Sequence, residues 1–326
     1  MIFKFEKNCH KFFLKSKTKN YIVCVAIGKK HYNDWKKYSS ELWLKYCKKN
    51  GLGIIVIYKN LISKKNHNWK SPTWQRLLVG NYLSLYEKNI NNICLLDTDI
   101  FINPFSPNIF KRLKKNKISV VTAFKDIPFL KSNFELRKKL VFLRKNFLSR
   151  KYPLNSSLTA SPKDIFKHYK FKKIFNNYFV AGVLVFNIGL FKNILFKNYK
   201  KYCENKLRDK FSGVEVPLNN ELMSSNLVSW LEYKFQAIWL FEIADKYNFL
   251  YHDKFKDKKI LKIIIEQILT ENYFLHFAGT LSDAKNVWKI KNILSDKKKL
   301  QLIKSYQNFK KKKIKTKFFK TKIKNI

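Results

Sequence analysis

Asp97 and Asp99, two aspartates separated by a single residue, are the strongest candidates in this sequence for a chemical role. They occur in a chain poor in acidic residues, directly after the apolar run of residues 93–96, which is typical of a short buried strand. Open parallel sheets bind ligands beyond the carboxyl ends of their strands, and paired carboxylates attract a hard divalent cation that can also bridge phosphates. The pair therefore predicts a metal site at a strand end, with a plain turn after the strand as the alternative.

A late histidine, His276, is a second candidate. It stands between Leu275 and Phe277, a setting in which a histidine is usually part of the apolar core. A neutral imidazole added to two carboxylates also makes a ligand set that suits Mn²⁺ or a similar ion. The residues alone leave both interpretations of His276 open.

The elements that must position these residues predict an α/β fold. Continuous apolar runs indicate buried strands at residues 21–28, 53–58, 93–96, 118–123, 179–187 and 273–277. Helical spacing of apolar residues appears at 35–51 after Asp34, from Ser71-Pro72 to residue 85, and at 215–226. This alternation predicts a Rossmann-like, mostly parallel central sheet with helices on both faces. We expect one domain over 21–296, a basic extension at 1–20 and a lysine-rich tail at 297–326.

The composition excludes some classes of protein and leaves others open. With 46% hydrophobic and 16% aromatic residues, the 326-residue chain is not a disordered one. Its 68 basic and 22 acidic residues, a net charge of +46, are compatible with nucleic-acid binding, an anionic membrane surface, or a general lysine bias. The excess is spread along the chain, except that residues 297–326 hold 13 lysines and no acid. We therefore interpret the basic residues spread along the chain as a compositional bias, and only the lysine cluster at 297–326 as a feature with a specific role.

The cysteines and the apolar segments predict a cytoplasmic location. The five cysteines form no Cys-x-x-Cys pair, and lysines interrupt residues 1–20 too often for a secretory signal. The longest apolar stretch, residues 178–191, is shorter than the roughly 20 residues of a membrane-spanning helix. We expect a chain that does not cross a membrane.

The blocks Trp74–Leu78 and Ile93–Pro104, which contain Arg76 and the Asp97-Thr98-Asp99 triplet, resemble nucleotide-sugar glycosyltransferases of the GT-A fold, with the family 8 group as the closest. Residues 179–187 (FVAGVLVFN) and 275–279 (LHFAG) resemble two later segments of that family. The resemblance implies that Asp97, Asp99 and His276 hold Mn²⁺ or Mg²⁺ against the diphosphate of the donor.

The same resemblance implies roles for further residues. Arg76 would bind phosphate or donor sugar, and Glu215 or Asn219 would lie beside the anomeric carbon. The nucleotide side of the site would comprise Ala26, Ile27, Gly28 and Tyr32 at the base, with Thr98, Gly182, Gly279 and Lys285. Each has a plainer alternative: a surface arginine, a glutamate in the first turn of a helix, an exposed loop aromatic, or a glycine needed for helix–sheet packing. Two positions depart from the family, since Val180 replaces an asparagine and Lys285 is displaced by three residues.

Taken together, the sequence predicts a metal-dependent transferase that moves a hexose from a nucleoside-diphosphate sugar, UDP-linked by resemblance, to a hydroxyl of a cell-surface glycan or glycolipid, with retention. The tail at 297–326 alternates lysines with bulky apolar residues, which is typical of segments on anionic membrane surfaces. Such a tail would place the enzyme at the inner face of the membrane. The alternative is that residues 297–326 are a lysine-rich end without a role. A nucleic-acid-binding protein and a catalytically inactive sugar-nucleotide binder remain the alternative functions, and no nucleic-acid partner is expected.

Overall fold

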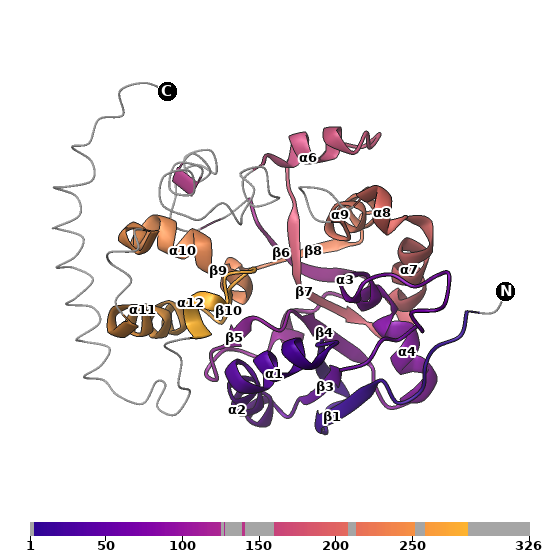
Figure 1. Cartoon of the computed structure of the whole chain (residues 1–326), viewed down its shortest axis with the longest axis horizontal. Helices are drawn as coiled ribbons and strands as arrows, with labels where there is room; N and C mark the ends of the chain where they lie inside the picture. Colours follow the sequence, from indigo (N-terminus) through magenta and orange to yellow (C-terminus); the bar gives the residue numbers. More distant parts are fainter. Residues whose placement is uncertain are drawn as a thin grey trace.

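The computed structural model describes residues 3–124, 127, 139–140, 160–207, 213–251 and 258–285. Its main sheet has seven strands in the order β1-β3-β2-β4-β7-β6-β8 (Figure 1). The strands are β1 His10–Leu14, β2 Asn20–Val25, β3 Gly53–Ile57, β4 Asn92–Leu96, β6 Ile118–Thr122, β7 Phe179–Asn187 and β8 Val228–Leu231. The expected tail at 297–326 and most of 131–159 lie outside the described residues.

The direction of the strands confirms the predicted α/β fold with a mostly parallel sheet. Strands β2, β3, β4, β6 and β8 run in one direction, whereas β1 and β7 run in the other. Strand β7 has the bounds that its apolar run predicted, and it lies antiparallel between β4 and β6. Strand β1 falls within the segment expected to be a basic extension, and it pairs with β3.

Both faces of the central strands β2, β3, β4, β6 and β7 are buried because these strands are mostly apolar. In β2, Ile22 and Cys24 pack into one core while Tyr21 and Val23 pack into the other. The first core is covered by α1 Lys29–Tyr38, α2 Ser40–Asn50, α10 Trp239–Lys246 and α11 Lys258–Glu271. The second is covered by α3 Pro72–Gln75, η1 Arg76–Leu78, α4 Val79–Tyr86, α7 Ile188–Lys201 and much of α9 Glu215–Ser224. The remaining elements are η2 Ile109–Arg112, α6 Pro162–His168, α8 Glu204–Leu207, η3 Tyr233–Gln236, η4 Asn248–Tyr251 and α12 Ser282–Lys285.

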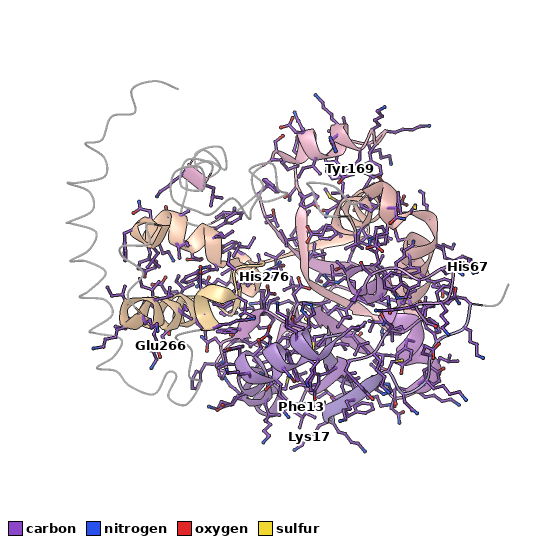
Figure 2. The ribbon with its side chains drawn as sticks, in the orientation of Figure 1. Phe13, Lys17, His67, Tyr169, Glu266 and His276 are labelled. Carbon is purple, nitrogen blue, oxygen red and sulfur yellow. The ribbon has the colours of Figure 1, made fainter. Side chains whose placement is uncertain are left out.

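The sequence did not predict a second, smaller sheet, nor strands β1 and β8 of the main sheet. The small sheet consists of β5 Ile100–Ile102, β10 Phe274–His276 and β9 Ala237–Ile238, in the order β5-β10-β9. Strand β10 was expected, but β5 and β9 are too short to leave a pattern. Because β5 begins directly after Asp99 and β10 ends at His276, this sheet connects the two halves of the predicted metal site. In Figure 2, His276 lies near the middle of the molecule, whereas Lys17 and His67 point outward.

The helix expected at 35–51 is two helices, which corrects that prediction. Helix α1 already contains Asp34, and the break falls at Ser39. The buried Ser39 hydroxyl donates to the carbonyl of Thr98 (2.8 Å), which ties the break to the loop between the two aspartates. Among the described helices, none has both the length and the apolar character that a membrane crossing requires.

Candidate metal centre and the adjoining cavity

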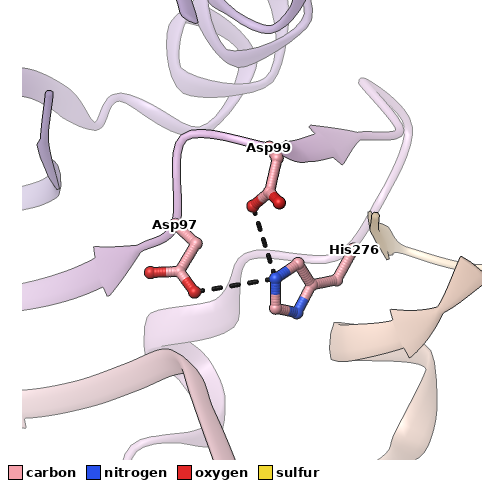
Figure 3. A group of neighbouring side chains, drawn as sticks. All are labelled: Asp97, Asp99 and His276. Carbon is pink, nitrogen blue, oxygen red and sulfur yellow. Dashed lines mark ion pairs between the residues drawn. The ribbon is translucent and has the colours of Figure 1, made fainter. Parts of the chain in front are cut away.

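Three side chains from two distant segments meet at the carboxyl end of β4. His276 Nε2 lies 3.3 Å from Asp99 Oδ1 and 3.6 Å from Asp97 Oδ2 (Figure 3). One ligand atom from each of the three residues falls within 4.8 Å of the others. The predicted association of the Asp pair with His276 is therefore present, in a geometry that could hold a metal ion.

The charges of this group influence one another strongly. Burial alone raises the pKa of Asp99, but the His276 imidazole and the backbone N–H of Gly279 (3.1 Å from Oδ2) outweigh it, so the pKa lies below its ordinary value. Burial alone lowers the pKa of His276, but Asp99, Asp97 and Glu215 outweigh it, so that pKa is raised. The carboxylates therefore favour a positive charge in the space between them, whether a proton or a cation.

Arg76 is not a surface arginine. Its side chain is 8% exposed, and Nη1 lies 3.0 Å from Asp97 Oδ1. It stands at the junction of α3 and η1, where Ser71-Pro72 begins the helix as the sequence indicated. In this position Arg76 orients Asp97 and also lines the adjoining cavity.

Gly182 brings the two sheets into direct contact. Its carbonyl accepts a hydrogen bond from the backbone N–H of Asp97 (3.0 Å). A Cβ atom at this position would lie 2.6 Å from His276 Cε1 and 2.7 Å from Gln236 Nε2, closer than packed atoms approach. The glycine is thus required by two side chains of the small-sheet region, rather than by helix–sheet packing.

Gln236 is a residue of the site that sequence reasoning missed. It ends η3, immediately before β9, and its Nε2 lies 3.1 Å from His276 Nδ1. The two residues are 40 positions apart and are brought together by the parallel pairing of β9 with β10, so no local spacing could have revealed the contact.

Glu215 and Asn219, both on α9, have different surroundings. Glu215 lines the cavity, accepts a hydrogen bond from the Ala181 N–H (3.1 Å) and has a pKa raised to about 7, first by burial and then by the charge of Asp97. Asn219 is fully buried, and its amide bonds both the N–H and the carbonyl of Phe179. The expectation that Asn219 faces a sugar is therefore corrected: its amide joins α9 to β7 and so positions Glu215.

A cavity of about 630 Å³ is lined by Asp97 and Asp99, two of the three metal-ligating candidates. Of the residues expected on the nucleotide side, Ile27, Thr98, Gly279 and Lys285 line it together with Asp97, Asp99, Arg76 and Glu215. Other lining residues, to which the sequence assigned no role in the site, include Lys30, His31 and Asp34 of α1. These residues occupy positions i, i+1 and i+4 of α1 and therefore share one face of the helix. The sequence reveals this shared face only when the helix is known to begin directly after Gly28.

Three residues expected at the nucleotide base do not line this cavity. Ala26 is buried, with its N–H bonded to the Ile57 carbonyl. Tyr32 is half-buried, and its ring packs against the rings of Trp35 and Tyr58. Gly28 is exposed and adopts a φ of 95° before α1, so its contribution is the turn that directs α1 along the cavity.

Lys285 lines the cavity and forms an ion pair there. Its Nζ lies 2.6 Å from Asp34 Oδ2, which joins α12 to α1, and both residues line the cavity. Ala278 and Gly279 have positive φ angles of 45° and 84°, and this tight turn carries the chain from β10 toward α12. The displaced lysine of the sequence thus does reach the cavity, where it is held by a carboxylate.

No family model matches this sequence, and no curated protein sequence matches it. Among solved structures, the chain is similar to a glycosyltransferase involved in glycosylation of the major capsid of PBCV-1 (11% identity, 80% of this chain, 93% of that one, TM-score 0.44). It is also similar to the galactosyltransferase LgtC in complex with donor and acceptor sugar analogues (13% identity, 87% of this chain, 95% of that one, TM-score 0.42). A third is the bifunctional glycosyltransferase WbbM (13% identity, 81% of this chain, 46% of that one, TM-score 0.45).

Proposed function

We propose that this chain is a metal-dependent glycosyltransferase of the GT-A type, which transfers a hexose from a nucleoside-diphosphate sugar to a hydroxyl group. The observation that carries the proposal is the meeting of Asp97, Asp99 and His276 within 4.8 Å, beside a cavity of about 630 Å³. Cavities of roughly 300–1,000 Å³ are those that hold small-molecule ligands. Two carboxylates and an imidazole fit Mn²⁺ well, whereas Mg²⁺ prefers oxygen ligands alone.

The metal, when bound, would neutralise the charge that develops on the diphosphate as the sugar leaves. The chain's own residues supply the rest of the binding energy. Arg76 holds Asp97 in place and lines the cavity, where its guanidinium, Lys30 and Lys285 together provide positive charge. A diphosphate entering this cavity competes with Asp34 for Lys285, because both are anions within reach of the same ammonium group.

Glu215 is the residue we place beside the anomeric carbon. Its carboxylate lines the cavity, and the N–H of Ala181 fixes it from β7. With a pKa of about 7, part of the population is ionised at neutral pH, and this form stabilises positive charge developing on the sugar ring. We propose transfer with retention, in which the leaving phosphate takes the proton of the acceptor hydroxyl; the anomeric configuration of the product, read by NMR, tests this.

The acceptor and the location complete the proposal. A lipid-linked or cell-surface glycan acceptor would bring the enzyme to the inner face of the membrane, with the basic residues 297–326 adsorbed there. Each basic residue near an anionic surface contributes on the order of 1 kcal/mol. We expect truncation at residue 296 to abolish binding to phosphatidylserine/phosphatidylcholine vesicles at moderate salt while donor hydrolysis continues. Equal vesicle binding by the truncated chain would contradict a membrane role for the tail.

The function itself is tested by thermal unfolding of the full chain with UDP-glucose, UDP-galactose and GDP-mannose, each with and without Mn²⁺. A ligand that binds the native state raises the unfolding midpoint. We expect one sugar nucleotide to raise it more with Mn²⁺ than without, and to be hydrolysed slowly in the same mixture. Binding without any hydrolysis or transfer would identify an inactive binder. No response to any donor, together with a rise caused by a nucleic-acid duplex at physiological salt, would overturn the proposal.

A further inference from the structure

The inner side of the His276 ring is contacted by Gln236, a side chain that is 1% exposed. Its Nε2 lies 3.1 Å from His276 Nδ1, while Nε2 of the same ring faces the two aspartates. The other polar atom of this amide, Gln236 Oε1, is buried and has no hydrogen-bond partner among the described residues. A buried polar atom without a partner has lost its hydrogen bonds to water and gained none in the protein, so this orientation of the amide is an unfavourable one for its oxygen.

The two orientations of the amide have opposite consequences for the imidazole. A half-turn about the last side-chain bond of a glutamine exchanges its NH₂ group with its carbonyl oxygen. With the NH₂ toward His276, Nδ1 must accept the hydrogen bond, and a neutral ring then carries its proton on Nε2. With the oxygen toward His276, Nδ1 carries the proton and donates it, and Nε2 presents a lone pair toward Asp97 and Asp99. Only the second arrangement leaves Nε2 able to bind a cation.

We propose that Gln236 is the positioning residue of the metal centre: its Oε1 accepts the Nδ1–H of His276 and thereby holds Nε2 unprotonated toward the aspartates. The inference rests on the proposed function, since it assumes that Asp97, Asp99 and His276 receive a divalent cation. The second orientation gives the oxygen of Gln236 this hydrogen bond and moves its NH₂ group to the position that the oxygen otherwise occupies.

The surrounding backbone fixes this contact. Gln236 directly precedes β9, and the pairing of Ile238 with His276 sets the two side chains next to each other. On the other side, a Cβ atom at residue 182 would lie within 2.8 Å of both the Gln236 amide and the imidazole. Gly182 therefore allows the Gln236 amide and the His276 ring to pack together against β7. The carbonyl of Gly182 also accepts a hydrogen bond from the backbone N–H of Asp97.

The test is Mn²⁺ affinity of the full chain, measured by electron paramagnetic resonance without donor or acceptor. Gln236→Leu removes the acceptor, and Gln236→Glu supplies an acceptor that, when ionised, cannot donate. Loss of a residue that orients a metal-bound histidine costs about 10–100-fold in metal affinity. We expect that loss for Gln236→Leu, and an affinity equal to or above wild type for Gln236→Glu. Gln267→Leu is the matched control, because Gln267 on α11 is also buried and its Oε1 also lacks a partner among the described residues.

A second readout needs no substitution: the ¹⁵N chemical shifts of His276 in the wild-type chain with Zn²⁺, a diamagnetic ion that binds imidazole, should show a protonated Nδ1 and an unprotonated Nε2. A proton on Nε2 in the metal-bound chain overturns the inference. An equal loss of Mn²⁺ affinity in Gln236→Leu and Gln236→Glu, or no loss in either variant, also overturns the role of Gln236. Both outcomes leave metal binding and the proposed function intact. A wild-type chain that binds no Mn²⁺ overturns both.

Discussion

Two groups of partly buried acidic and basic side chains in the described part of the chain have similar residue types but different roles. Between α10 and α11, Lys246 Nζ lies 2.9 Å from Glu242 Oε2 and 2.7 Å from Glu271 Oε2. At the end of β4, His276 Nε2 stays 3.3 and 3.6 Å from the carboxylates of Asp99 and Asp97. The helical group is closed by its own lysine, whereas the strand-end group borders a cavity.

The difference shows how a structural ion pair can be told from a binding site. In the helical group a flexible ammonium fills the space between two glutamates, so the charges are satisfied from within the chain. In the strand-end group, Arg76 contacts Oδ1 of Asp97, and the space between the carboxylates is bordered by Nε2 of the His276 imidazole. Such a group has room and charge for an ion from solution, and the predictions below separate the two groups.

The largest effect is expected for Asp99→Ala, which removes one proposed ligand without disturbing the core. Metal-dependent transfer should fall by about 10²–10³-fold or more, because charge on the leaving diphosphate is no longer neutralised. Transfer rates and Mn²⁺ affinity measure this, and circular dichroism checks that the fold persists. Asp164→Ala, on α6 and outside the cavity lining, is the control and should keep full activity. Undiminished metal-dependent transfer by Asp99→Ala would contradict the assigned site.

The converse substitution is Lys246→Met in the helical group. It leaves the carboxylate of Glu242, whose side chain is 1% exposed, without its lysine. Breaking such a buried pair costs about 3 kcal/mol of unfolding free energy, while Mn²⁺ affinity should not change. Denaturant unfolding measures the first and paramagnetic resonance the second. Lys45→Met, which breaks the exposed pair with Glu41, is the control, and its loss of unfolding free energy should stay below about 0.5 kcal/mol. A change in Mn²⁺ affinity in Lys246→Met would contradict the separation of the two groups.

A smaller effect is expected for Arg76→Lys. Lysine keeps the charge but lacks the planar guanidinium that can contact Asp97 and a phosphate together. The kcat/KM for the donor should fall roughly tenfold, about 1.4 kcal/mol. Arg112→Lys, in an exposed pair with Glu232, is the matched control. Donor kinetics identical to wild type would leave Arg76 with a purely structural role.

The smallest effect concerns pH. Burial raises the pKa of Glu215 from 4.5 to about 7, so between these values the folded chain holds a proton that the unfolded chain has released. The stability that this proton provides is present below pH 4.5 and is lost as pH rises through 7. Glu215→Gln cannot lose it, so its advantage over wild type should grow from pH 5 to 7 and then level off. We expect about 1 kcal/mol, since solvent in the cavity screens part of the cost.

Glu221→Gln provides a control of opposite sign. Burial works to raise the pKa of Glu221, but Lys201 and Tyr202 outweigh it, and that pKa is lowered. Its replacement should therefore weaken the chain at neutral pH and matter less as pH falls. Thermal unfolding from pH 4.5 to 8 compares both variants with wild type. The same pH trend in both would mean that burial does not set the pKa of Glu215.

The sequence was sufficient for the elements that carry a dense local pattern. Strand β7 and the end of β4 follow from continuous apolar runs, and the aspartates were placed at that strand end because the run stops there. The resemblance to glycosyltransferases, rather than any spacing, selected His276. The other two strands of the small sheet, β5 and β9, were not predicted, because a strand of two or three residues leaves no recognisable sequence pattern. Their structure depends on pairing with β10, which comes from the far end of the domain.

Residues that act through such pairing were missed or misplaced for the same reason. Gln236 meets His276 only because β9 lies beside β10. Asn219 was expected to face a ligand, yet the backbone of Phe179 binds its amide, a partner that no sequence pattern reveals. Tyr32 packs onto neighbouring aromatic rings instead of lining the cavity.

The 180 residues that separate Asp99 from Gly279, whose backbone N–H binds it, have a consequence for synthesis. A growing chain emerges from its N-terminus, so the two aspartates leave the ribosome long before β10 exists to pair with β5. Contacts of such long range form late, because the loop between them must first be closed. A divalent cation that binds only the assembled group would stabilise the finished chain and leave nascent ones unaffected. Metal supply in the cell would then set how much of the newly made protein persists, as well as how fast it works.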